Sequence, residues 1–141
     1  MLSFRIKIDD KEILKKLAKQ KAILSVGFWN DIYDGKGKSV ASVAAFNEFG
    51  GGHTPPRPFM RNCVKRNRRK WRNSVKDRLP VILDMEKMAQ ELGEDMVEDL
   101  RYEIYLTNTP PNAPSTIKRK GFNKPLIDTG KMVNSVRMEV K

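Results

Sequence analysis

The sequence predicts an α+β domain in which helices, including a long helical hairpin, pack against a small, mostly antiparallel sheet. Short segments near both ends of the chain alternate apolar and polar residues, as half-buried strands do. The segments between them place apolar residues three and four positions apart, as helices do. The chain has 141 residues, 39% of them hydrophobic, which suits one core. We therefore expect a single domain spanning residues 1–141.

The first predicted elements are a strand and a short helix. Phe4, Ile6 and Ile8 alternate with basic residues, which is typical of a strand. Asp9 and Asp10 then offer an N-cap to a helix. The apolar positions of this helix follow helical spacing and are Ile13, Leu14, Leu17 and Ala18.

A second strand and a second helix follow. Residues 22–28 are mostly apolar and predict a more deeply buried strand, and residues 29–38 form a polar loop with glycines. Ser39 is placed to cap a helix whose small residues permit close approach to a sheet. The glycines at 50–52 are expected to end that helix.

The middle of the chain predicts the helical hairpin. The proline-rich residues 54–58 form a rigid connector, and Phe59 opens a helix running toward Arg78. Pro80 is expected to break or kink it, so that a second helix runs from about Val81 to Tyr105. The expected apolar faces are Met60, Val64, Trp71 and Val75 on the first helix, and Met85, Met88, Leu92, Met96, Leu100 and Ile104 on the second.

The last part of the chain predicts a loop and a closing strand. Residues 107–124 are rich in proline and polar residues and are expected to be loop-like. Val136, Met138 and Val140 then alternate as a strand.

The run Asp128-Thr129-Gly130 has two interpretations, one catalytic and one structural. An aspartic protease presents its catalytic carboxylate in such a run, as half of a pair sharing one proton. Only eleven residues follow Gly130, too few for the walls of a substrate cleft. In the structural reading, which we favour, Leu126 and Ile127 anchor the segment and Asp128 or Thr129 caps a helical turn.

No other residues suggest an enzyme, a cofactor or a metal site. His53 and Cys63 are each the only residue of their type and are separated by a proline-rich corner, so no zinc site is predicted. The glycines at 50–52 lack the spacing of a phosphate-binding or dinucleotide-binding loop. One cysteine, no leader-like segment and no long apolar run predict a protein that assembles in a reducing cytoplasm and does not span a membrane.

The charge is strongly segregated along the chain. The formal net charge is +11, which favours an acidic partner. Residues 57–76 are basic without an acid, whereas residues 84–103 are mainly acidic. Three interpretations of these charged segments stay open. They form contacts between subunits, they pair within one hairpin, or the arginines face DNA.

Three segments together resemble a family of tailed-bacteriophage virion proteins. They are a helix ending in Asn-Glu-Phe-Gly (39–50), a Pro-x-Arg-Pro-Phe corner (55–61), and residues 112–117 followed by a late Pro-Leu-x-Asp-Thr-Gly (125–130). The chain is similar to the HK97 gp10-like neck and tail-completion group, with the Mu-like virion-morphogenesis proteins as relatives. The motif residues are Glu48, Phe49, Gly50, Pro58, Phe59, Leu126, Asp128, Thr129 and Gly130.

The resemblance implies a tail terminator or head-to-tail joining protein that is not an enzyme. Such a protein forms a ring, commonly a hexamer, between the connector and the tail tube of the virion. Its expected partners are copies of itself, the adaptor or stopper proteins, the tail-tube protein and, where the tail is contractile, the sheath. Genomic DNA would pass through the lumen without sequence-specific binding.

The candidate interface joins the two charged stretches of neighbouring subunits. Arg57 is expected to reach a neighbour's carboxylate, since a guanidinium suits bidentate pairing. Phe59 is expected to be a buried anchor. The candidate interface residues are Arg57, Arg61, Lys65, Arg68, Arg72, Glu91, Asp95, Glu98 and Asp99.

The alternative is a small basic nucleic-acid-binding protein. Arg61, Lys65, Arg68 and Arg72 form one basic stripe on the predicted helix, with Trp71 beside it. Trp71 also belongs to the apolar face of that helix, which favours a place in the core over a base-stacking role.

Overall fold

The computed structural model describes residues 11–141 and has the predicted α+β architecture. The expected strand over 4–8 and the caps at Asp9 and Asp10 lie outside these residues. The elements in chain order are α1 (Lys11–Leu17), β1 (Leu24–Gly27), α2 (Val40–Phe49), α3 (Phe59–Ile82), α4 (Met85–Leu106), α5 (Pro114–Lys120), α6 (Lys131–Asn134) and β2 (Arg137–Val140).

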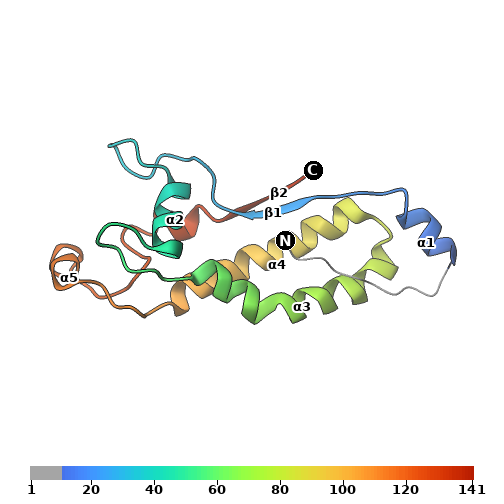
Figure 1. The fold of residues 1–141 in the computed structure, drawn as a ribbon. Coiled ribbons are helices and arrows are strands. Elements are labelled where there is room, and N and C mark those ends of the chain that lie inside the picture. The colour runs from blue at the N-terminus through green and yellow to red at the C-terminus, as the bar shows by residue number, and fades with distance from the viewer. Residues whose placement is uncertain (1–10) are drawn as a thin grey trace.

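The molecule is elongated along the α3–α4 hairpin (Figure 1). β1 and β2 pair antiparallel, with Leu24 opposite Val140 and Gly27 opposite Arg137. This two-stranded sheet lies along the hairpin, and α4 packs against both strands. α1 lies at one end of the molecule, whereas α2, α5 and α6 lie at the other (Figure 1).

The apolar faces of the hairpin form most of the core, as the helical spacing predicted. Trp71 and Val75 of α3 are buried. Met60, Val64, Met85 and Met96 are partly buried against the same core. The buried members of the predicted α4 stripe are Met88, Leu92, Leu100 and Ile104.

Gly93 sets the distance between α4 and the sheet. A Cβ built on this glycine would overlap Met138 Sδ and lie 2.8 Å from Leu24 Cδ1. Both of these side chains come from the two strands, so the missing side chain lets the helix lie close to them. The sheet itself is only half-buried, because Leu24 and Val26 are partly exposed; the deeper burial predicted for residues 22–28 was wrong.

Of the break or kink predicted at Pro80, the break was wrong. Pro80 lies inside the last turn of α3, and the chain leaves the helix at Leu83, which has φ 53°. Pro80 has no N–H to donate to the carbonyl four residues earlier, yet α3 continues through it to Ile82. Asp84 then caps α4 by accepting a hydrogen bond from the Lys87 N–H at 3.0 Å.

A side chain from outside the hairpin holds its turn. The Gln20 amide donates to the Leu83 carbonyl at 3.2 Å and accepts from the Met85 N–H at 2.8 Å. The carbonyl belongs to the left-handed residue Leu83 and the N–H lies two residues later, so one amide satisfies backbone groups on both sides of the turn.

The prediction that residues 107–124 are loop-like was wrong in part, because they contain α5. Pro114 stands at the first turn of α5, where a proline's missing N–H has no helical partner to lose. Gly121 ends the helix with φ 83°. Among the described helices none is both long enough and apolar enough to cross a bilayer.

Candidate interaction groove and the α2–α3 junction

Glu48 joins the end of α2 to the start of α3. Its side chain is 2% exposed, and its carboxylate accepts hydrogen bonds from the Met60 N–H at 2.8 Å and the Arg61 N–H at 3.2 Å. Arg61 Nε adds an ion pair at 2.8 Å. The N-cap residue of α3 is Pro58, which has no side-chain hydrogen bond to offer. A carboxylate from another helix therefore caps α3, and its charge suits the positive end of the helix dipole.

Arg57 fastens the connector to the loop after α4. The residue is 5% exposed, its Nε donates to the Pro110 carbonyl at 2.7 Å, and its Nη2 donates to the Pro111 carbonyl at 2.9 Å. Burial lowers the pKa of this guanidinium. The structure thus gives Arg57 two partners inside its own subunit, and the contact with a neighbour's carboxylate stays a prediction.

The rest of the corner is packed as an anchor. Phe59 is fully buried, as predicted, and meets Phe28 edge to face with ring centroids 6.0 Å apart. Gly50 ends α2 with φ 78°, and a Cβ there would lie 3.0 Å from Pro56. The Asn-Glu-Phe-Gly and Pro-x-Arg-Pro-Phe segments thus form one structural unit.

The Pro-Leu-x-Asp-Thr-Gly segment (125–130) leads into the start of α6. Gly130 takes the N-cap position with φ 80°, and the Thr129 hydroxyl accepts a hydrogen bond from the Lys131 N–H at 3.3 Å. Asp128 instead forms an ion pair with Arg119 of α5 at 3.0 Å. Leu126 is partly buried against the core with φ 65°. These residues link α5 to α6, which packs against α2.

A groove of about 590 Å³ runs between α2 and α3. Its floor is apolar, and Arg61, Lys65 and Arg68 lie along it from α3. Phe49 is 68% exposed at the groove, with its ring centroid 5.2 Å from the Arg61 guanidinium carbon. The apolar lining residues are Phe28, Ala41, Ala44, Ala45, Met60 and Val64.

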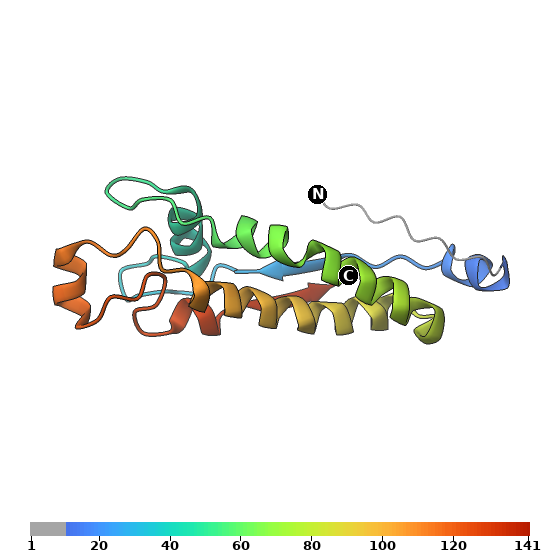
Figure 2. The same cartoon turned by 90° about the horizontal axis from the view of Figure 1, so that it is seen from below.

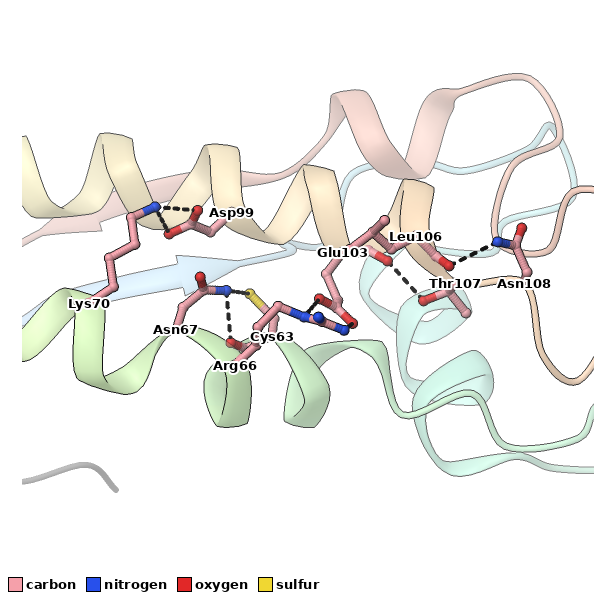
Figure 3. Close-up of polar contacts among 9 residues, drawn as sticks. All are labelled: Cys63, Arg66, Asn67, Lys70, Asp99, Glu103, Leu106, Thr107 and Asn108. Atoms are coloured by element: carbon pink, nitrogen blue, oxygen red, sulfur yellow. Dashed lines mark hydrogen bonds and ion pairs between the residues drawn. The ribbon is translucent and has the colours of Figure 1, made fainter.

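Part of the segregated charge pairs within the hairpin. Arg66 contacts Glu103 at 2.9 Å, and Lys70 contacts Asp99 at 2.6 Å (Figure 3). Arg78 reaches Asp95 at 3.0 Å. Glu91, Asp95 and Asp99 of the candidate interface therefore have partners on α3 of the same subunit.

Trp71 is part of the core. It is 2% exposed, and its indole N–H donates to Asp99 at 2.7 Å. A base cannot stack on a ring buried in this way, so the structure places Trp71 in the core, as the apolar spacing favoured.

The remaining candidate interface residues face outward. Within residues 11–141, Lys65, Arg68 and Arg72 form no ion pair, and Glu98 contacts only Arg101 of its own helix, at 2.9 Å. Lys65 and Arg68 line the groove, whereas Arg72 lies beyond it.

The single cysteine and the single histidine do not share a site. Cys63 is buried and His53 is exposed. Burial raises the pKa of the Cys63 thiol to about 11, so the thiol stays protonated near neutral pH. Residues 11–141 contain no cluster of three or more histidine, cysteine or acidic side chains that could hold a metal ion.

Sequence reasoning missed the burial of Glu48 and Arg57, and with it the groove. For Glu48 a signal existed, since Val40, Ala44 and Glu48 are spaced by four residues and all three are buried. For Arg57 none existed, because its partners are backbone carbonyls 53 and 54 residues away.

In comparisons with known proteins, no family model, curated protein or solved structure matches this chain.

Proposed function

We propose that this chain is a structural virion protein of a tailed bacteriophage, acting as a tail terminator or head-to-tail joining protein. It would form a ring between the connector and the tail tube, with six copies as the expected number. One observation carries the proposal: the three sequence segments that resemble such proteins meet in space at one junction. Glu48 caps α3, Arg57 holds the carbonyls that precede residue 112, and α6 packs on α2.

The surface of the molecule supports a role in assembly. A subunit that joins others in a closed ring needs two different, complementary faces. Phe46 and Phe49 of α2 are 58% and 68% exposed, and Tyr102 and Tyr105 of α4 are 61% and 51% exposed. Aromatic side chains left in water on two separate helices are typical of surfaces that a partner covers.

Deleting the gene from its phage tests the proposal. If the protein joins head to tail, electron micrographs of the lysate should contain DNA-filled heads and separate tails, and supplying the chain from a plasmid should restore whole particles. Intact particles from the deleted phage would contradict the proposal.

The unpaired cations of α3 also favour one other function, sequence-independent binding of nucleic acid. Within the described chain, five basic residues of α3 form no ion pair: Lys65, Arg68, Arg69, Arg72 and Lys76. A monomer that used all five on phosphates would show a slope of about −4 to −5 in log affinity for duplex DNA against log salt concentration. A shallow slope or no binding would reject this alternative.

A further inference from the structure

We infer that the α2–α3 groove of one copy binds the outer face of α4 of a second copy. The inference rests on the proposed function only in that copies of this chain assemble. The groove and the outer face of α4 are both exposed, and they complement each other in charge and in apolar content.

The groove offers an apolar floor beside free cations. Its lining comes from the alanines of α2 together with Met60 and Val64 of α3, with the exposed Phe49 ring beside them. Arg61 is held in place by Glu48 at 2.8 Å. Lys65 and Arg68 lie along the groove and form no ion pair with any described residue, so their charges remain for a partner.

The outer face of α4 carries the matching groups. Glu94, Glu98, Tyr102 and Tyr105 follow one another at steps of four, four and three residues, which places them on one side of the helix. All four are exposed, while the opposite side of α4 is buried against α3 and the sheet. We name these four residues the acidic aromatic stripe. Its carboxylates suit Lys65 and Arg68, and its rings suit the apolar floor.

The two surfaces come from helices on different sides of the molecule. Figure 2 shows α2 and the first turns of α3 along one long side and α4 along the other. A contact between these different sides is heterologous, so each copy keeps one free groove and one free stripe. Repeating the contact adds further copies side by side, and a ring forms when the rotation from copy to copy closes.

The apolar floor favours a protein occupant over nucleic acid. A phosphate backbone has little to gain from alanine and methionine side chains, whereas tyrosine rings bury apolar area there. Charge pairs at the rim would add specificity and a dependence on salt.

Reciprocal charge reversal tests the contact. One variant carries Lys65→Glu and Arg68→Glu, and the other carries Glu94→Lys and Glu98→Lys. Each alone should lose self-association about 100-fold, because like charges then face each other. An equimolar mixture should associate again, since every groove then meets a stripe of opposite charge. Light scattering after size exclusion gives the masses, and circular dichroism checks that each variant is folded.

A matched control is Arg72→Glu with Lys76→Glu, which changes the net charge of α3 equally but lies outside the groove. This variant should assemble as the wild-type chain does. Assembly of the Lys65→Glu/Arg68→Glu variant at wild-type strength, or no recovery in the mixture, would overturn the inference. If that variant keeps its mass but loses binding to duplex DNA, the groove belongs to nucleic acid instead.

If the wild-type chain is monomeric at micromolar concentration, disulfide cross-linking tests the contact instead. Chains with Lys65→Cys and chains with Glu98→Cys, mixed at millimolar concentration under mild oxidation, should give a disulfide-linked dimer of the two. The buried thiol of Cys63 should not react. Absence of the mixed dimer would overturn the inference, whereas failure of the gene-deletion test would leave this contact standing and reject only the proposed role in the phage.

Discussion

The α2–α3 junction and the α3–α4 hairpin are held together in different ways. The junction depends on a few buried charged groups, chiefly Glu48 at 2% exposure and Arg57 at 5%. The hairpin depends on many apolar side chains, and its ion pairs lie at the surface; the Lys70 side chain, for instance, is 57% exposed. Hydrogen bonds to a buried charged group contribute more to stability than an exposed ion pair does. Single substitutions should therefore have large effects at the junction and small effects on the hairpin surface.

The largest effect is expected for Glu48→Ala. The substitution leaves the Met60 and Arg61 N–H groups without their acceptor inside the junction. The free energy of unfolding should fall by about 3 kcal/mol, because several hydrogen bonds to one buried carboxylate are lost together. Urea denaturation followed by circular dichroism measures it, and Glu98→Ala, which removes an exposed glutamate, serves as the control and should change stability by less than about 0.5 kcal/mol. Equal effects of the two variants would refute the comparison.

Arg57→Ala should have the next largest effect. The Pro110 and Pro111 carbonyls lose a charged donor, and the expected loss of stability is about 2–3 kcal/mol. Arg69→Ala is the matched control, since this exposed arginine forms no ion pair with any residue of 11–141. Hydrogen exchange should also become faster in residues 107–113 of the Arg57→Ala variant alone. Unchanged exchange there would argue that the loop is held by other contacts.

Gly93→Ala extends the comparison to the side of the hairpin that faces the sheet. In an open helix the change would stabilise by about 1 kcal/mol. Here the added methyl group would overlap Met138 and lie 2.8 Å from Leu24 Cδ1, so we expect a destabilisation of about 1–3 kcal/mol. Thermal unfolding measures it, with Gln90→Ala as an exposed control on the same helix. A stabilised Gly93→Ala variant would mean that the sheet can move away at little cost.

The smallest effect is expected for Lys70→Ala. Its contact with Asp99 is exposed, and Asp99 keeps the hydrogen bond from the Trp71 indole. The loss should stay within about 1 kcal/mol and shrink further in high salt. Urea denaturation at two salt concentrations checks this, with Lys76→Ala as the unpaired control. A loss as large as that of Glu48→Ala would erase the distinction between the two regions.

The hairpin was predictable from the sequence because many apolar residues share in stabilising it. Residues such as Trp71, Leu92 and Ile104 repeat with the helical period. Many core contacts of the same kind therefore appear in the sequence as apolar residues at helical spacing. Its end was not predictable in the same way. Pro80 predicts a break or a kink, but α3 continues through it and the chain leaves the helix at Leu83.

The junction was only partly predictable. Phe59 as an anchor and Gly50 as a helix end follow from residue type alone. The burial of Arg57 and Glu48 does not, because a charged residue is assigned to the surface unless its partners are known. Those partners are backbone groups, which carry no signature in the side-chain sequence. The same limit applies to the groove, whose two walls come from separate helices.

The charge of α3 has a consequence for the order of synthesis. The helix carries nine basic residues and a single acid, Asp77, and pairs such as Arg61 and Lys65 or Arg68 and Arg72 repel each other one turn apart. Alone, such a segment is a poor helix at low salt. Its compensating acids, Asp95, Asp99 and Glu103, are encoded after the turn. We therefore expect α3 to remain unstructured on the ribosome until most of α4 has been translated, and the two helices to form together.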